Sequence, residues 1–307
     1  MPSTAKTDRR TRAASANIKV LRADAFAALP WLVHGFSTRT GGNSTCYGGK
    51  SLNLGVTSHD THQHVEGNRQ LFLRALGALN SDGTAWRLAQ DRQIHSSIIH
   101  RIDGTPHHVP TGDGMITAVP GLLLAVKTAD CVPVLIADVE RRVVGAFHAG
   151  WRGTVSRIAE KGVGEMRRTF GSDPGDLRAA IGPCIRKCCY SVGPEVKAEF
   201  DSQFSYAAEL FEEVFDSKAI HVRYSLLFLN QRVFLNQRAP GYGDRGPEIH
   251  LDLVSANKRQ LQDAGVHGEN ISVVDGCTAC DTKCFFSHRA EFGKTGRMMA
   301  AIGIRPE

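Results

Sequence analysis

The sequence predicts a protein that combines α-helices with β-strands, an α+β fold. Short runs of β-branched and other apolar residues, bounded by polar residues or glycine, are typical of strands, and Val132–Asp138 and Val143–Phe147 are two of them. Longer segments carry apolar residues at helical spacing, from Val65 to Leu79 and from Val155 to Phe170. Both patterns recur along the chain, so we expect helices packed against sheets.

The composition is that of a globular protein. The 307 residues are 42% apolar and 22% charged, which is ordinary for a soluble domain. The longest apolar runs have the length of strands, so the sequence predicts no membrane-spanning segment and no membrane partner. Residues 1–22 lack the apolar centre of a signal peptide. Eight cysteines without an export signal indicate a reducing compartment, and we expect a cytoplasmic protein.

The positive charge is concentrated at the N-terminus. Residues 1–22 carry six lysines and arginines against one aspartate, which gives +5 of the whole chain's +6. The remaining chain is nearly neutral, so we expect no basic face for nucleic acid. Residues 1–24 are predicted to be a basic, disordered leader, and we expect that removing residues 1–22 leaves stability unchanged.

The first folded elements are predicted to be a strand, a glycine-rich loop and a helix. The strand covers Trp31–Phe36, and Arg39 and Gly41-Gly42 follow it. Paired glycines let a backbone approach a ligand, and an arginine fork clamps anions, although a plain turn explains the loop equally well. A helix follows from Val65 to about Asn80. Three histidines precede or begin it and are interpreted as exposed polar residues rather than metal ligands: His59, His62 and His64.

In the centre of the chain, residues that can act as nucleophiles or metal ligands follow the ends of apolar runs. The run Gly121–Val126 leads to Cys131, and the run Val143–Phe147 leads to His148. His95 lies upstream, shortly after another apolar-rich stretch. One thiol and two imidazoles suit a Zn²⁺ site whose fourth position stays open for water or substrate.

The second half of the chain continues with helices and strands around one irregular segment. Thr154 is predicted to cap the N-terminus of the Val155–Phe170 helix, whose positive end would favour an anion near His148. Residues 201–249 contain a tandem Phe-Leu-Asn-Gln-Arg repeat and are interpreted as an insertion. We therefore expect residues 25–307 to form a single catalytic domain with an insertion at about 201–249. The other predicted elements are a strand at Ala179–Ile181, a helix from Pro194 to Phe200, a helix ending at Ala264, a strand at Ile271–Val274 and a last strand through Ile304.

Together these motifs resemble the family variously called multicopper polyphenol oxidase (laccase-like), peptidoglycan editing factor and purine nucleoside phosphorylase. The motifs occur in family order over about residues 30–304. They are His34–Arg39 with Gly41-Gly42, Ser51–Gly55, Val65 with Asn68-Arg69, Gln93–Ser96, Asp113-Gly114, Thr128–Cys131, His148–Gly153, Ile181–Ile185, Cys277-Thr278, Phe286–Arg289 and Thr295–Arg297.

The resemblance implies a mixed-sheet α/β sandwich of the type found in cytotoxic-necrotizing-factor-like and laccase-like proteins. It implies a catalytic zinc held by His95, Cys131 and His148. It also implies phosphorolysis of adenosine, inosine, guanosine and methylthioadenosine, together with deamination of adenosine. The expected partners are therefore purine nucleosides and inorganic phosphate. The chain departs from the usual bacterial pattern in the 201–249 segment and in four further cysteines: Cys188, Cys189, Cys280 and Cys284.

The two implied reactions need different groups. Zn²⁺ can activate a water for attack on C6 of adenine. Phosphorolysis needs cations and backbone N–H groups that hold phosphate, and Arg39, Arg152 and the Gly41-Gly42 loop are the candidates. Asn53, in a family motif, is assigned to substrate binding with them. Asp130 would accept a proton or orient a ligand histidine, and an ordinary turn residue is an equal alternative.

Four alternative interpretations remain open at the level of sequence. Cys131 and His148 would be nucleophile and base of a metal-free hydrolase acting on a peptidoglycan precursor. A structural zinc would need a fourth ligand such as Cys184 or Cys277. A copper-dependent polyphenol oxidase is disfavoured because one His-x-His among 13 histidines does not supply a multicopper cluster. A second metal would use the Cys277, Cys280 and Cys284 spacing, with Cys184, Cys188 or Cys189 as further ligands.

Overall fold

The computed structural model describes residues 18–104, 108–214 and 248–307. The chain forms two compact units: the first contains residues up to Arg186 and from Leu253 to Glu307, and the second contains Lys187–Asp252. We describe the two units separately. Within the described residues, no helix is both long and apolar enough to span a bilayer.

The first unit contains two sheets that mix parallel and antiparallel pairs. β4 runs parallel to β7 in the first sheet, and β5 and β14 run parallel to β6 and β10 in the second. The order of the first sheet is β1 (Val20–Leu21), β2 (Leu32–Ser37), β15 (Met298–Ile304), β7 (Leu122–Thr128) and β4 (Arg87–Ala89). The order of the second sheet is β14 (Ile271–Val273), β10 (Leu177–Ile181), β8 (Val132–Asp138), β9 (Val143–Ala149), β6 (Gly114–Thr117) and β5 (Ile99–Arg101).

The side chains of β7 show how the layers of the first unit are joined. Leu122, Leu124 and Val126 pack in a core with residues of β8 and β9 from the second sheet. Leu123 and Ala125 alternate with them and pack in a separate core with helix α2 (His62–Leu76). Successive side chains of a strand point to opposite faces, so one strand contributes to both cores. The predicted α+β, mixed-sheet sandwich is therefore confirmed.

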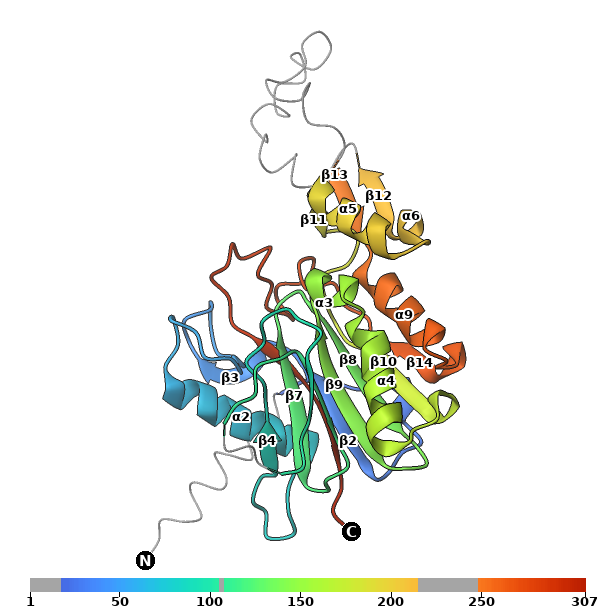
Figure 1. Cartoon of the computed structure of the whole chain (residues 1–307). Coiled ribbons are helices and arrows are strands. Elements are labelled where there is room, and N and C mark those ends of the chain that lie inside the picture. The colour runs from blue at the N-terminus through green and yellow to red at the C-terminus, as the bar shows by residue number, and fades with distance from the viewer. Residues whose placement is uncertain (1–17, 105–107, 215–247) are drawn as a thin grey trace, which may run out of the picture. The chain divides into compact units, whose positions relative to one another are not determined.

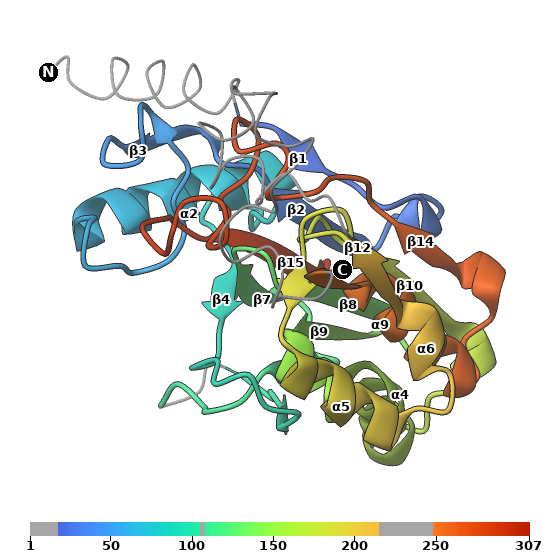
Figure 2. The same ribbon diagram turned by 90° about the horizontal axis from the view of Figure 1, so that it is seen from above.

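Helices cover the outer faces of the sandwich. Figures 1 and 2 show α2 beside the sheet of β2 and β15, and α4 (Ile158–Phe170) with α9 (Leu253–Asp263) beside the other sheet. The shorter elements of this unit are η1 (Asp24–Phe26), β3 (Thr40–Ser44), α3 (Trp151–Val155), η2 (Pro174–Asp176) and η3 (Gly268–Asn270). The four layers are thus helix, sheet, sheet and helix.

The local sequence explains where α2 begins and ends. The hydroxyl of Thr61 accepts a hydrogen bond from the backbone N–H of His64 at 3.2 Å, which caps the N-terminus. Gly77 ends the helix with φ at 73°, a left-handed conformation that glycine adopts without strain. His62 and His64 lie in the first turn and are exposed or half-buried, as the sequence predicts.

The predicted cap at Thr154 is wrong. A short helix, α3, already begins at Trp151, and Gly150 is its N-cap residue. Thr154 is fully buried, and its Oγ1 accepts a hydrogen bond of 3.0 Å from Asn257 of α9. Arg157, with φ at 61°, separates α3 from α4. The apolar stripe is continuous across this break, which is why the sequence predicted one helix.

The described part of the second unit, residues 187–214 and 248–252, contains a small three-stranded sheet and two helices. Its strands, in order, are β11 (Ser191–Val192), β13 (Glu248–Leu251) and β12 (Phe211–Val214), and its helices are α5 (Pro194–Gln203) and α6 (Ala207–Leu210). The ring of Phe200 lies 5.6 Å from those of Phe204 and Phe211. The predicted insertion at 201–249 falls within this unit, and its tandem repeat lies outside the described residues. A single domain with an insertion stays a prediction.

The folded chain begins before the predicted end of the leader at residue 24. Val20 and Leu21 pair with Ser37 and Phe36 of β2 as an edge strand. Arg22 donates hydrogen bonds to the carbonyls of His34 and Leu76. Residues 1–17 lie outside the described part of the chain.

We expect different results from two N-terminal deletions. Removing residues 1–22 deletes β1 and the contacts of Arg22, so we expect the melting temperature to fall by at least about 3 °C, the effect of about 1 kcal/mol in a protein of this size. Removing residues 1–17 leaves these contacts intact and should change it little. Differential scanning calorimetry of both truncations measures this. Equal melting temperatures for the two truncations would show that β1 does not stabilise the sheet.

Candidate metal centre

Three separate segments of the first unit bring Cys131, His148 and His95 together. Cys131 directly precedes β8, and His148 is the next-to-last residue of β9. The two strands pair antiparallel, with Val132 opposite Ala149, so the start of one meets the end of the other. His95 comes from the loop that follows β4. All three residues predicted as metal ligands therefore meet at one site.

The geometry of these three side chains fits a tetrahedral metal. Their potential ligand atoms all lie within 4.8 Å of one another, and Sγ of Cys131 is 3.8 Å from Nε2 of His95. The two imidazole rings are 5.0 Å apart at 77°. Metal–ligand bonds of about 2.0–2.3 Å at tetrahedral angles place ligand atoms about 3.3–3.8 Å apart. His95 is exposed while His148 is buried, which leaves an open side toward solvent.

The backbone at Gly150 lies so close to the side chains of His95 and Cys131 that no larger residue fits there. A Cβ atom on Gly150 would lie 2.9 Å from Cδ2 of His95 and 3.2 Å from Sγ of Cys131. His95 and Asp130 have φ angles of 61° and 93°, conformations that non-glycine residues rarely adopt. Strain of this kind is characteristic of functional sites.

Asp113 is the residue of this site that the sequence reasoning did not assign. Its fully buried carboxylate lies 2.8 Å from Nδ1 of His148 and accepts a hydrogen bond of 3.0 Å from the backbone N–H of His95. It also accepts hydrogen bonds from the backbone and the hydroxyl of Ser96 and from the backbone of Ile94. Because Nδ1 of His148 is engaged, Nε2 is the atom that faces the site. The Asp113-Gly114 motif was the only signal.

The charges at the site are strongly coupled. Burial raises the pKa of Cys131, but the adjacent His148 outweighs it and lowers the pKa to about 6. Burial lowers the pKa of His148, and the attraction of Cys131 and the hydrogen bond to Asp113 raise it to about 10. Burial would raise the pKa of Asp113, yet hydrogen bonds from His148 and Ser96 hold it well below its usual range. The site thus stabilises a thiolate, the form in which cysteine binds metal.

Asp130 connects Cys131 to two other family motifs. Its carboxylate accepts a 2.6 Å hydrogen bond from the hydroxyl of Thr278 and a 2.7 Å bond from the backbone N–H of Arg289. The side chain is 8% exposed. These contacts favour a positioning role over that of an ordinary turn residue, and a role as proton acceptor stays a prediction.

Arg39 and Asn53 are tied into the protein. The guanidinium of Arg39 donates to Glu291 at 3.0 Å and to backbone carbonyls of Tyr47, Thr282 and Phe285. Asn53 is fully buried. Its side-chain amide donates to Asp60, and its side-chain oxygen accepts from the backbone N–H groups of Gly55 and Arg297. Gly42 lies against the backbone of Ser51, where a Cβ would come within 2.2 Å of the carbonyl oxygen. These contacts favour structural roles, and binding of substrate by Arg39 or Asn53 stays a prediction.

Arg152 differs from Arg39 because it is exposed. Its guanidinium carbon lies 4.1 Å from the centre of the Trp151 ring, at the start of α3. Gly150, which contacts the metal ligands, is two residues away. Arg152 is therefore placed beside the site with its charge open to solvent.

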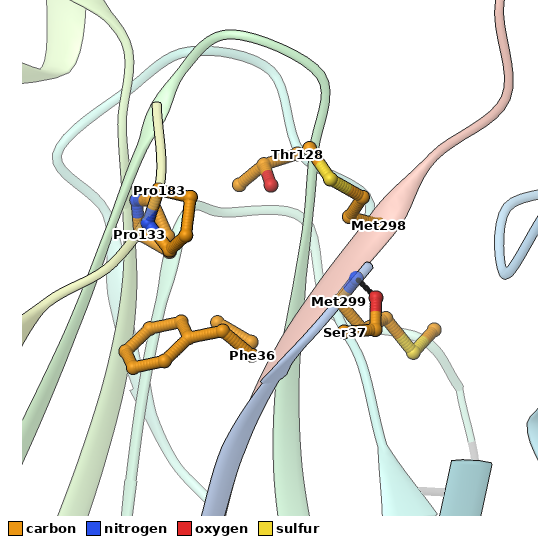
Figure 3. Close-up of a pocket in the computed structure, with 8 residues that line it drawn as sticks. Phe36, Ser37, Thr128, Pro133, Pro183, Met298 and Met299 are labelled. Atoms are coloured by element: carbon orange, nitrogen blue, oxygen red, sulfur yellow. Dashed lines mark hydrogen bonds between the residues drawn. The ribbon is translucent and has the colours of Figure 1, made fainter. Parts of the chain in front are cut away.

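A small pocket lies between the two sheets, next to the strand ends that carry the site. It has room for about one water molecule, with a volume of about 10 Å³, and its lining consists of apolar residues together with Ser37 and Thr128, as Figure 3 shows. The hydroxyl of Ser37 accepts a hydrogen bond from the backbone N–H of Met299. The pocket does not include the three predicted metal ligands, so it is not evidence for the nucleoside-binding position.

The other histidines and cysteines predicted or considered at the sequence level do not extend this centre. Among the described residues, no histidine besides His95 and His148 joins a group of three or more potential metal ligands. Cys277, Cys280 and Cys284 belong to the first unit, whereas Cys188 and Cys189 belong to the second. A second metal site stays a prediction.

The chain is similar to one family model and to several known proteins over most of its length. A family model described as "Multi-copper polyphenol oxidoreductase laccase" matches residues 33–305. A protein of Deinococcus radiodurans named purine nucleoside phosphorylase is 36% identical over 277 residues, 88% of each chain. A protein named adenosine deaminase RL5, from an unknown prokaryotic organism, is 35% identical over 190 residues, 62% of this chain and 61% of that protein. The crystal structure of YlmD from Geobacillus stearothermophilus matches with a TM-score of 0.72 and 30% identity, over 94% of this chain and 96% of that one.

We expect metal content to depend on four residues of the site. His95→Ala, Cys131→Ala and His148→Ala should each lose the bound metal, because each removes one of three ligands. Asp113→Asn keeps all three ligands but removes the charge that orients His148, so we expect metal affinity to fall about 10–100-fold.

Elemental analysis and competition with a chromophoric chelator measure these changes. Asp103→Asn, at an exposed aspartate 65% accessible, is the matched control and should bind metal normally. Full metal content in all three alanine variants would contradict the ligand assignment.

Proposed function

This chain belongs to the family described as multi-copper polyphenol oxidoreductase laccase, and we propose that it is a zinc-dependent enzyme that cleaves purine nucleosides with phosphate and also deaminates adenosine. The observation that carries the proposal is an open site of one thiolate and two imidazoles in a chain whose relatives are named purine nucleoside phosphorylase and adenosine deaminase. The proposed substrates are adenosine, inosine, guanosine and methylthioadenosine. The proposed location is the cytoplasm.

Zinc suits this ligand set better than copper. A thiolate with two imidazoles and an open fourth position is typical of catalytic zinc. Multicopper oxidation needs several histidine-rich sites, and His95 and His148 are the histidines that the described residues bring together. When bound by His95, Cys131 and His148, Zn²⁺ supplies Lewis-acid activation of water and of polar substrate atoms.

The protein groups around the ligands hold this chemistry in place. Asp113 fixes the imidazole of His148 with Nε2 facing the site. Asp130 fixes the turn before Cys131 through Thr278 and Arg289. In deamination, the oxygen of water adds to C6 of adenine and ammonia leaves. In phosphorolysis, a phosphate oxygen bonds to C1′ of ribose while the C1′–N9 bond breaks, and the purine leaves with that electron pair and gains a proton.

Phosphorolysis also needs positive charge near the site. Arg152 is our candidate among the arginines predicted from the sequence, because its guanidinium is exposed and the residue lies two positions from Gly150. Arg39 is less suited, since four acceptors of the protein already contact its guanidinium. We propose that Arg39 holds the loop of residues 282–291 instead.

A metal-free hydrolase is the second candidate function, acting on a peptidoglycan precursor. The lowered pKa of Cys131, about 6, and the adjacent His148 fit a nucleophile and its base. This mechanism gives His95 no role, although His95 lies 3.8 Å from the thiol and shares the carboxylate of Asp113. That arrangement favours the metal.

We expect purified protein to convert adenosine to two sets of products. With phosphate present, it should release adenine and ribose 1-phosphate, and with or without phosphate it should form inosine. Liquid chromatography of reaction mixtures separates these products. Chelation to the metal-free state, and Cys131→Ala, should abolish both reactions, and added Zn²⁺ should restore the chelated protein.

Two results would contradict the proposal. Absence of both adenine and inosine would exclude adenosine as a substrate, and the same result with inosine, guanosine and methylthioadenosine would exclude purine nucleosides altogether. Activity that survives complete metal removal but is lost in Cys131→Ala would support the metal-free hydrolase instead.

A further inference from the structure

Three basic side chains meet at one edge of the layer between α2 and the first sheet. Lys127 lies in β7, two residues after Ala125, so its side chain is on the sheet face that packs against α2. Lys127 pairs with Met299 of β15, and Arg297 comes two residues before Met299. Arg69 lies on α2, three and four residues before Phe72 and Leu73 of the same core. The apolar core between α2 and the first sheet is therefore bordered at one edge by the side chains of Lys127, Arg69 and Arg297.

Contacts with neighbouring segments hold these three cations in position. Arg69 donates to the carbonyl of Leu54 at 3.1 Å, and the carbonyl of Arg297 accepts from the N–H of Leu54 at 2.9 Å. The side chain of Arg297 packs on Gly55, where a Cβ would come within 2.6 Å of it, and its Nη1 donates to the carbonyls of Thr295 and Gly296 at 3.1 and 2.9 Å. The ammonium group of Lys127 donates to the carbonyl of Asp91 at 3.2 Å. All three cations are partly buried.

Two carboxylates, Glu66 and Asp91, lie near the three cations in the described part of the chain. Glu66 approaches Arg69 at 3.6 Å from the solvent side and is 49% exposed. Asp91 faces Lys127, is 1% exposed, and has no hydrogen-bond partner for either carboxylate oxygen among the described residues. Burial and the charges of Arg69 and Arg297 lower the pKa of Lys127, against the effect of Asp91. The three cations repel one another, and a bound anion would relieve that repulsion.

The unpartnered carboxylate of Asp91 favours an anion that can donate a hydrogen bond over one that cannot. A buried carboxylate needs hydrogen-bond donors. Hydrogen phosphate carries both negative oxygens for the cations and a P–OH group that can donate to Asp91. Sulfate carries the same charge at neutral pH but has no hydrogen to donate.

The cations also lie next to the metal centre along the chain. Gln93 bonds the backbone of Lys127 twice, at 2.8 and 2.9 Å, and is two residues from His95. Cys131 is four residues beyond Lys127. Burial and the negative charge of Asp113 raise the pKa of Asp91 to about 7, against the opposing charges of Lys127 and His148, so this carboxylate is mostly ionised above pH 7.

We propose that these three cations and Asp91 form the subsite that binds hydrogen phosphate. The P–OH group of the bound phosphate donates a hydrogen bond to the carboxylate of Asp91. This inference rests on the proposed function, in which phosphate is the second substrate. It assigns phosphate to the α2 side of the metal centre, whereas Arg152 lies at the start of α3 on the solvent side.

Isothermal titration calorimetry of the metal-loaded full chain with inorganic phosphate, without nucleoside, tests the subsite directly. At pH 8, we expect phosphate to bind at least about tenfold more tightly than sulfate, because sulfate would leave the buried carboxylate of Asp91 without a hydrogen-bond donor. Lys127→Gln and Arg69→Gln should each weaken phosphate binding by about tenfold or more, the loss of one charge-assisted hydrogen bond. Asp91→Asn should reduce the preference for phosphate over sulfate.

Arg74→Gln is the matched control, because Arg74 lies on the same helix and is exposed. It should bind phosphate normally, and thermal melting checks that every variant is folded. Unchanged phosphate affinity in both Lys127→Gln and Arg69→Gln, or no measurable phosphate binding by the unmodified chain, overturns the proposal.

Steady-state kinetics separate this inference from the proposed function. We expect the KM for phosphate to rise about tenfold or more in Lys127→Gln, while adenosine deamination changes little. If phosphorolysis proceeds and only Arg152→Gln raises that KM, phosphate binds beside α3 and the inference is wrong although the function stands. If phosphate binding depends on the three cations but no nucleoside is cleaved, the subsite stands and the proposed function is wrong.

Discussion

The interaction on which the candidate metal centre depends is the hydrogen bond between Asp113 and His148. The carboxylate is fully buried and has five polar neighbours, one of them the ligand His148 and the others in the loop that carries His95. One carboxylate therefore fixes two ligands that lie more than fifty residues apart. Without its charge, four donors of that loop and the imidazole would lose their common acceptor, and the ligand geometry would be lost with it.

Much of the fold could be predicted from the sequence, and so could the three residues that meet at the candidate metal centre. β8 covers Val132–Asp138 as the apolar run indicates, and α2 follows the apolar spacing after Val65. Cys131 and His148 were recognisable because each stands at the end of such a run. A strand and its ends are determined largely by residues close together in the sequence, so a local apolar pattern is enough to predict them.

The roles of other residues depend on partners distant in sequence, and these were not predictable. Arg39 lies in a glycine-rich loop that suggests an anion site, but its partner Glu291 is 252 positions away. Thr154 has the residue type of a helix cap, whereas the structure buries it against Asn257. Asp113 lies in a short motif that does not indicate its role, and Lys127 shows no special local pattern. Their importance arises only when β6, β7 and the 91–96 segment come together.

The alternating side chains of β7 restrict how this chain can change in length. Val126 belongs to the sandwich core, and the next residue, Lys127, belongs to the opposite face. Inserting or deleting a single residue between Leu122 and Val126 would exchange these faces for part of the strand, moving a charged side chain into the core and a valine to the cationic edge. It would also move Cys131 away from His148. Variation in length among relatives should therefore be confined to the loops outside this segment. The length of β7 determines which of its side chains face the sandwich core and which face α2.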